Sequence, residues 1–216
     1  ITSNDVESIP ADVDVIFEAD EAIEIFADVA LPTGPNNTAT FRVLNDDGSF
    51  KVANVEELER PDEFITTLST EGGDLVISAS SILDADFHEK FSLRLQTNGG
   101  DVSLTALPPS SVAGPLGIRI GTITTATDAE PAVPAGSVEI VSRGDVLVRE
   151  PIEPGSGVFG PADVNAAGTT GGSISLVGGD IAFRNVDASG TSGPAGDVTI
   201  DAAGSVIATY SGGTTL

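Results

Sequence analysis

The chain has 216 residues, of which 33 are acidic and nine basic, so its formal charge at pH 7 is -24. This excess of acids excludes nucleic acid and anionic membrane surfaces as expected partners, because both are bound through cationic patches. The absence of cysteine excludes disulfides and thiolate chemistry, and no apolar run is long enough to span a membrane. The 40% content of hydrophobic residues, mostly aliphatic, is sufficient for an ordered core.

The first third of the chain, residues 1–72, is irregular and carries a net charge of -14. Alternating apolar and polar residues predict short strands at 13–15, 23–25, 41–43 and 50–52, and Asp46-Asp47-Gly48 is typical of a hairpin turn rather than a calcium loop. We interpret these strands as degenerate versions of the repeats that follow. The chain begins at Ile1 without a signal-peptide pattern, so we expect a processed product or a piece of a longer protein.

From residue 73 onward a short phrase recurs: glycine, then Asp or Ser, then alternating apolar and polar residues. It begins at Gly73, Gly100, Gly136, Gly172 and Gly196. Such self-similarity marks a solenoid, in which each coil is buried only by its neighbours. The sequence therefore predicts an all-β protein, a parallel β-helix with regular coils over 73–216 and irregular acidic coils over 1–72. An antiparallel sandwich is the competing architecture, but it does not require the phrase to return in phase.

The last three repeats have a second arm, seven or eight residues after the first, which predicts a short strand and a tight turn where glycine supplies backbone freedom. Successive first glycines lie 27, 36, 36 and 24 residues apart, so we expect one corner of the coil to accept insertions, at 108–115, 125–135, 150–170 and 187–195. Alternation also assigns the two faces of each strand. The residues expected to point inward are Val138, Ile140, Val146, Val148, Ile174, Leu176, Ile181, Phe183, Val198, Ile200 and Val206, and those expected outward are Glu139, Leu147, Ser175, Ala182 and Thr199.

One cluster combines reactive side chains: Asp84, Asp86, His88, Glu89 and Lys90 surround the only histidine. Histidine paired with carboxylates can relay protons or bind a metal. No nucleophile motif or zinc pattern accompanies the cluster, so we interpret it as a solvated loop between strands at 75–77 and 93–95. The sequence therefore assigns no catalytic, cofactor-binding or metal-binding residue.

Aspartate follows the glycine of several repeats, at Asp74, Asp101 and Asp197 in the first arm and at Asp145 and Asp180 in the second. Stacked carboxylates are suitable ligands for calcium, the one cofactor that this pattern would allow. Ser137 and Ser173 interrupt the first series, and the nonapeptide of calcium-binding β-rolls is absent. We therefore expect turn aspartates that accept a hydrogen bond from a neighbouring backbone amide.

The stretch GGDIAFRNVDASGTSGPAGDVTIDAAGSVIATYSGG, residues 178–213, resembles the repeats of filamentous haemagglutinin-type exoproteins, which two-partner secretion systems export from cyanobacteria and other Gram-negative bacteria. DVDVIFEADEAIEIF, residues 12–26, resembles the degenerate coils of such proteins. The resemblance implies a right-handed parallel β-helix, export across the outer membrane, and a role in adhesion or surface structure. The Asn-Pro-Asn-Gly/Leu motif of the family's secretion domain is not found, which implies an internal portion or another export route.

These observations predict a secreted or cell-surface structural and adhesive protein that is not an enzyme. Its expected partners are other copies of itself, stacked end to end into filaments, or other surface and matrix components. Unpaired strands at the end of a solenoid favour such stacking. The alternatives are a carbohydrate-active β-helix enzyme that uses the Asp84–Lys90 cluster and a calcium-dependent binding module.

Overall fold

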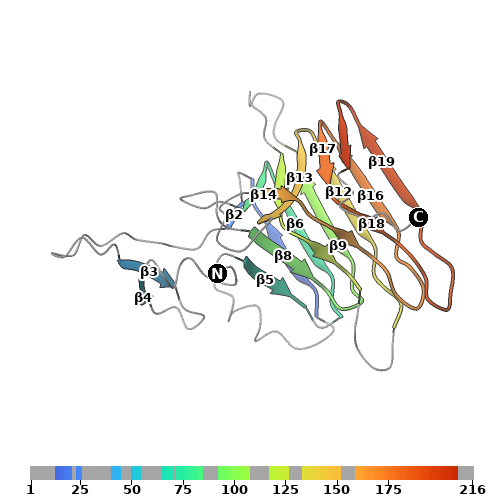
Figure 1. Ribbon diagram of the computed structural model, residues 1–216, viewed down its shortest axis with the longest axis horizontal. Helices are drawn as coiled ribbons and strands as arrows, with labels where there is room; N and C mark the ends of the chain where they lie inside the picture. Colours follow the sequence, from blue (N-terminus) through green and yellow to red (C-terminus); the bar gives the residue numbers. More distant parts are fainter. Residues whose placement is uncertain are drawn as a thin grey trace, which may run out of the picture.

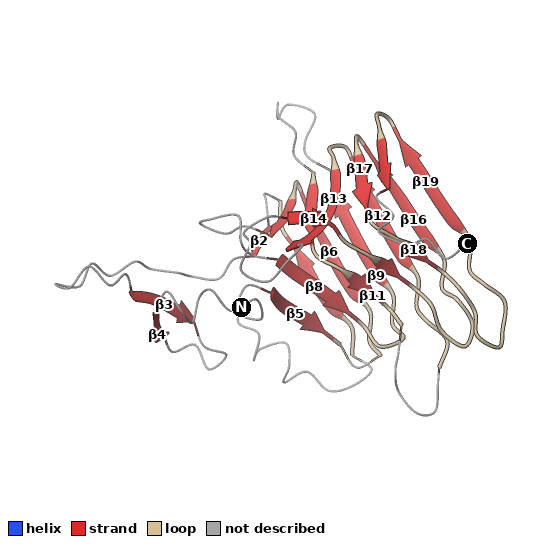
Figure 2. Ribbon diagram, in the orientation of Figure 1, coloured by secondary structure: helices blue, strands red, loops and turns tan. Residues whose placement is uncertain are grey.

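The computed structural model describes residues 13–20, 23–25, 40–44, 50–54, 65–70, 72–84, 92–107, 117–126, 133–151 and 159–208. Within these ranges every regular element is a strand, as Figure 2 shows. A search of the same ranges finds no helix with the length and hydropathy needed to cross a membrane.

Three parallel sheets make up the main body (Figure 1). The first sheet contains β1 (Val15–Glu18), β6 (Leu75–Ala79), β9 (Val102–Ala106), β12 (Val138–Ser142), β16 (Ile174–Gly178) and β19 (Val198–Ala202). The second contains β2 (Ile23–Ile25), β7 (Ile82–Asp84), β10 (Ile118–Ile120), β13 (Val146–Pro151), β17 (Ile181–Phe183) and β20 (Val206–Ala208). The third contains β5 (Ile65–Ser69), β8 (Ser92–Gln96), β11 (Ile123–Thr124), β15 (Val164–Asn165) and β18 (Val186–Asp187).

The chain visits the three sheets in turn and then begins the next layer, so that each strand pairs with its equivalents one coil before and one coil after. Figure 1 shows the coils side by side, following one another in chain order up to β19. This arrangement is a parallel β-helix, and it confirms the predicted fold class. The strands β1, β2 and β5 extend the three sheets by one coil toward the N-terminus.

Aliphatic ladders fill the interior because like residues stack above like. Val138 pairs with Val102 on one side and Ile174 on the other, and Ile140 lies between Leu104 and Leu176. The alternation predicts which side chains are buried in these coils, and all eight inward residues predicted between Val138 and Phe183 are buried. Each fully buried Leu or Ile stabilises the fold by roughly 1.5–3 kcal/mol relative to exposure.

The strand predicted at 93–95 is confirmed as part of β8, but a third sheet was not predicted, and insertions do not share one corner as expected. Residues 107–117 join the first sheet to the second, residues 85–91 join the second to the third, and residues 125–137 join the third to the next coil. Between the second and third sheets of a later coil, residues 152–158 join β13 to β14 (Phe159–Pro161), a short strand that pairs antiparallel with β13. All three corners therefore accept additional residues. The strands predicted at 41–43 and 50–52 are confirmed as β3 (Thr40–Leu44) and β4 (Phe50–Asn54), but their interpretation as coils is wrong, because they pair antiparallel with each other. The Asp46-Asp47-Gly48 turn between them lies outside the described residues.

Close backbone approach, rather than conformational freedom, explains the glycine that opens each phrase. Left-handed backbone is found at Gly72 and Gly99 among the described glycines, and the phrase glycines lack it. A Cβ atom on Gly136 would instead lie well inside 3.0 Å of the Gly100 carbonyl oxygen one coil earlier. The same holds for Gly172 above Gly136. Stacked glycines therefore let successive corners lie in contact.

Candidate functional site

The aspartates after these glycines form a ladder between coils. The backbone amide of Asp74 donates to Asp14 Oδ1 at 3.0 Å, and the amide of Asp101 donates to Asp74 Oδ1 at 2.7 Å. Ser137 continues the series: its amide donates to Asp101 Oδ1 at 2.7 Å, and its hydroxyl accepts the amide of Ser173 at 3.2 Å. The local turn bond predicted for these aspartates is therefore wrong, because each acceptor serves the next coil.

A second ladder runs along the start of the second sheet. Asp145 Oδ1 accepts the amide of Asp180 at 2.9 Å, and Asp180 Oδ1 accepts the amide of Ser205 at 2.6 Å. In both ladders one carboxylate oxygen has a structural role. Among the residues that the structure describes, no three His, Asp or Glu side chains gather closely enough to hold a metal ion.

Buried threonines close the corner between the third sheet and the next coil. The Oγ1 atoms of Thr70 and Thr125 donate to the carbonyl oxygens of Gly73 and Gly136, both at 2.5 Å. Thr97 Oγ1 makes the equivalent bond to the Gly100 carbonyl, and its side chain is completely buried. These bonds satisfy polar groups that would otherwise be buried without a partner, which costs about 1–3 kcal/mol each.

The outer face of the third sheet carries polar side chains that are aligned from strand to strand. One row, read across the sheet in register, is Ser69, Gln96, Thr124, Asn165 and Asp187. The neighbouring row, two residues earlier, contains Arg94, Thr122 and Asp163 in adjacent strands or at their starts. This polar face, defined by the two rows, is the candidate functional surface.

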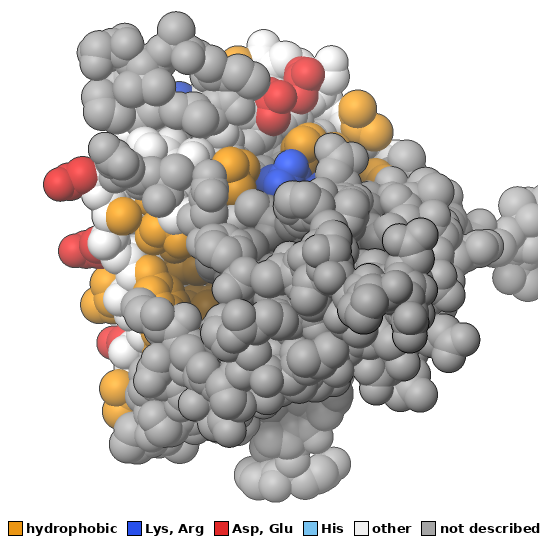
Figure 3. Space-filling model, turned by 90° about the vertical axis from the view of Figure 1, so that its left-hand side faces the viewer, with side chains coloured by type: hydrophobic (Ala, Val, Ile, Leu, Met, Phe, Trp, Pro, Cys, Tyr) orange, Lys and Arg blue, Asp and Glu red, His pale blue; other side chains and the backbone are white. Residues whose placement is uncertain are grey.

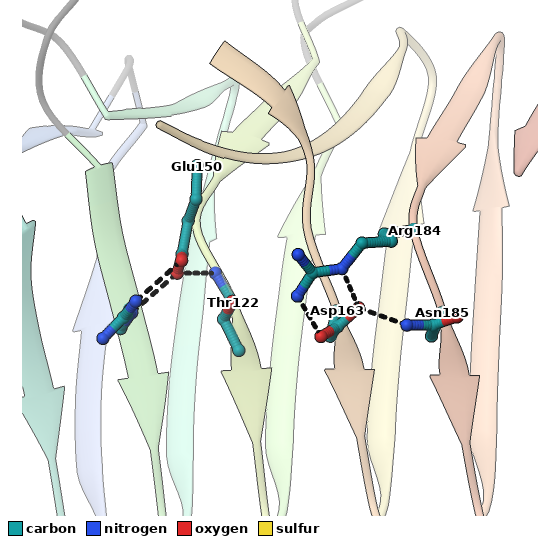
Figure 4. A network of polar contacts seen from close by, with 6 residues as sticks. Thr122, Glu150, Asp163, Arg184 and Asn185 are labelled. Carbon is teal, nitrogen blue, oxygen red and sulfur yellow. Dashed lines mark hydrogen bonds and ion pairs between the residues drawn. The ribbon is translucent and has the colours of Figure 1, made fainter. Parts of the chain in front are cut away.

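Glu150 connects β13 to this polar face. Its carboxylate accepts two hydrogen bonds from the Arg94 guanidinium, at 2.7 and 2.8 Å, and one from the Thr122 amide at 2.9 Å (Figure 4). Burial would raise the pKa of Glu150, but the hydrogen bonds from Arg94 and Thr122 and the Arg94 charge outweigh it and hold the pKa below its ordinary value. Glu150 is therefore ionised at neutral pH, and its oxygens are occupied by donors of the protein.

Asp163, in the same coil as Glu150, is held in the same way by two residues of the following coil. Its carboxylate accepts from both Arg184 Nε, at 2.8 Å, and the second guanidinium nitrogen, while Asn185 Nδ2 donates at 3.0 Å (Figure 4). The Arg184 hydrogen bond lowers the pKa of Asp163, and the carboxylate in turn raises the pKa of Arg184. Bidentate pairs of this kind fix the orientation of both side chains.

The reactive cluster predicted from the sequence is only partly placed. Asp84 is the last residue of β7, paired with Ile25, and so belongs to a strand rather than to a loop. The other four members, Asp86, His88, Glu89 and Lys90, lie outside the described residues. Sequence reasoning missed Arg94, Glu150, Asp163 and Arg184; the scarcity of basic residues was the one available signal, because each base among so many acids is a candidate ion-pair partner.

The C-terminal end of the described stack is open. Val198 and Val206, predicted to point inward, are 48% and 50% exposed, although their equivalents one coil earlier, Ile174 and Ile181, are buried. They differ because no further strand covers β19 and β20 within the described ranges. Ile207 is also 50% exposed. The result is an apolar end with two unpaired strand edges.

No family model, curated protein or solved structure matches the chain. The functional proposal therefore depends on the geometry of the stack, its polar face and its open end.

Proposed function

We propose that this chain is a rigid part of a secreted or cell-surface protein of the filamentous haemagglutinin type, with a structural and adhesive role. The observation that carries the proposal is that insertions at all three corners leave the strand registers intact. Residues 108–116 are inserted between β9 and β10, yet β9 stays paired with β12 over five residues and β10 with β13 over three. Such a stack presents variable segments without disturbing its own core.

The carboxylates at the polar face are ionised and already hydrogen-bonded, which supports a role in binding rather than in catalysis. Hydrolysis of a glycosidic bond requires a carboxylic acid with a raised pKa and a second, available carboxylate. Glu150 and Asp163 have lowered pKa values, and arginine and backbone donors occupy them. A face of fixed amides, hydroxyls and ion pairs is suited to recognition rather than to proton transfer.

The charge of the chain supports an extracellular partner of cationic or neutral chemistry. With 33 acids and nine bases, the molecule has no excess of positive charge with which to hold nucleic acid. We propose surface or matrix components and other copies of the chain as its partners. The haemagglutinin resemblance of residues 178–213 favours the same assignment.

The proposal is tested by retention of the fluorescently labelled chain on bacterial cells and on extracellular matrix preparations. In a matched pair of variants, either residues 108–116 or residues 152–158 are replaced by a Gly-Ser linker of equal length. We expect retention of the wild-type chain and loss of retention in at least one variant, with an unchanged melting temperature. No retention on any surface, or release of new reducing ends from a glycan by the purified chain, would contradict the proposal.

A further inference from the structure

We propose that the hairpin formed by the end of β13 and by β14 is a strap that fastens three successive coils: the β6, β9 and β12 coils, each named after its strand in the first sheet. The strap consists of Arg149–Pro151 and Phe159–Pro161, which pair antiparallel. Because of the strap, the β6 coil separates from the β9 coil only when its bonds to the β12 coil are also broken. This inference does not depend on the proposed function.

Hydrogen bonds that skip a coil are the observation that carries the proposal. The carboxylate of Glu150, in the β12 coil, accepts the Thr122 amide of the β9 coil at 2.9 Å and the Arg94 guanidinium of the β6 coil at 2.7 and 2.8 Å (Figure 4). Ser92, also in the β6 coil, donates its hydroxyl to the Arg149 carbonyl at 3.0 Å. The aspartate and serine ladders, in contrast, join adjacent coils. The strap therefore adds a contact of longer range to a stack of neighbours.

A glycine in the intervening coil makes room for one of these bonds. The β9 coil passes from β10 to β11 through Gly121, whose amide donates to the Leu93 carbonyl at 2.8 Å. A Cβ atom on Gly121 would lie well inside 3.0 Å of Ser92 Oγ. The missing side chain therefore lets the Ser92 hydroxyl pass this coil and reach the Arg149 carbonyl in the next one.

The strand that carries the strap extends beyond its own sheet. β13 has six residues, whereas β7, β10 and β17 have three each. The Ala162 amide donates to the Val148 carbonyl at 2.8 Å, which closes the base of the hairpin. The Ala162 carbonyl accepts the Arg184 amide of the following coil at 2.7 Å. The strap is thus anchored in its own coil and in the next, while Arg149 and Glu150 reach back to earlier coils.

The contacts of the strap are sheltered from water. Ser92 is completely buried, and the side chain of Glu150 is 14% exposed, against 44% for that of Arg94. A bidentate bond between a guanidinium and a carboxylate is stronger than a bond between neutral groups and fixes both side chains. Basic side chains are scarce, as Figure 3 shows for the N-terminal side, so the use of one of nine bases in this contact is a specific feature. Because Arg94 and Thr122 belong to the polar face, the strap also holds that face in a fixed shape.

Native-state hydrogen exchange tests the proposal, because it reports the local separation of structural units. One amide in each sheet bonds the β6 coil to the β9 coil: Leu75 to the Asp101 carbonyl, Ile82 to the Gly117 carbonyl and Leu95 to the Thr122 carbonyl. If only neighbouring coils interacted, a substitution in the β12 coil would leave the exchange of these three amides unchanged. With the strap, a substitution of Glu150 accelerates their exchange from two coils away.

Two variants weaken the strap from opposite coils. Glu150→Gln loses the charged bidentate bond and is expected to accelerate exchange of the three amides about fivefold. Ser92→Ala loses the bond to the Arg149 carbonyl and is expected to accelerate it about two- to tenfold. Asp145→Ala is the matched control, because Asp145 lies in the same coil as Glu150 but accepts the Asp180 amide of the following coil at 2.9 Å. We expect it to lower the free energy of unfolding in urea about as much as Glu150→Gln does, and to change exchange of the three amides less than about twofold.

Two results would overturn the proposal. Equal acceleration by Asp145→Ala and Glu150→Gln would show that the three amides exchange only when the whole chain unfolds. Unchanged exchange in both strap variants would show that the bonds to the β12 coil do not resist separation of the β6 coil. Because Ser92→Ala and Glu150→Gln alter different coils, the test stands on either one if the other fails to fold.

Discussion

Substitution of Gly136 by alanine is the most direct test of the stacked-glycine corner. The new methyl group would lie well inside 3.0 Å of the Gly100 carbonyl oxygen and 2.8 Å from the Asp101 amide nitrogen. Both atoms belong to the backbone, so no side-chain rotation relieves the overlap. Overpacking of this kind costs about 1–3 kcal/mol. Separating the two coils would also weaken the bond from the Val102 amide to the Ser137 carbonyl, 2.9 Å, and the bond from the Ser137 amide to Asp101, 2.7 Å.

Each of those two hydrogen bonds contributes about 0.5–1.5 kcal/mol, so the expected loss in the free energy of unfolding is about 2–6 kcal/mol. Gly178→Ala is the matched control, because the atom nearest to its methyl group would be the Val146 Cγ2 methyl at 2.8 Å, a side-chain atom rather than a backbone atom of the neighbouring coil. We expect a loss of about 1 kcal/mol there. The assay is urea denaturation followed by circular dichroism, with the slope compared between variants. Equal losses in the two variants would refute the explanation by close backbone approach.

Three further changes test the polar contacts. Glu150→Gln is expected to lower the free energy of unfolding by about 1 kcal/mol at pH 7. Because folding lowers the pKa of Glu150, this difference between wild type and variant is fully present above the ordinary pKa of 4.5 and disappears as the pH falls through the pKa of the folded state. Urea midpoints of both proteins, measured from pH 7 to pH 3, test this. Thr97→Val removes the side-chain hydroxyl that donates to the Gly100 carbonyl, and it is expected to lower the free energy of unfolding by about 1–3 kcal/mol. Thr97→Ser keeps this donor and is expected to lower it by less. Urea denaturation of both variants measures the difference. Asp101→Ala removes the acceptor of the Ser137 amide and is expected to lower the free energy of unfolding by about 0.5–1.5 kcal/mol. Asp101→Asn keeps an acceptor oxygen and is expected to be as stable as wild type. An equal loss of stability for both variants in thermal melts would mean that the charge matters and the hydrogen bond does not.

The first sheet could be predicted because its strands are five residues long from β6 onward and begin with the same phrase. The third sheet could not, because β11, β15 and β18 have two residues each, too few to show alternation. Strand β7 also lacks the opening glycine, so the sequence analysis placed Asp84 in a loop rather than in a strand. The exposure of Val198 has a different cause: strand alternation indicates which way a side chain points, but not whether another coil covers it.

The ion pairs of the polar face could not be predicted because coil length varies. Arg184 lies 21 residues after Asp163, whereas Arg94 and Glu150 are 56 residues apart. No single spacing relates such partners, so the sequence offers no period at which to look for them. The recurring aspartates could be recognised in the sequence, but the sequence did not indicate which coil donates the amide that each carboxylate accepts. Which amide each carboxylate accepts depends on the distance between coils, and that distance is set by the glycines of the corner.

The direction of the ladder connects the fold to the proposed role. Each coil donates amides forward from its inward positions and back to the carboxylate behind it, so a coil is complete only when it has neighbours on both sides. Stability in such an array is the sum of contacts between adjacent coils, and it depends little on what is inserted at the corners. Surface segments can therefore vary while the stack stays rigid.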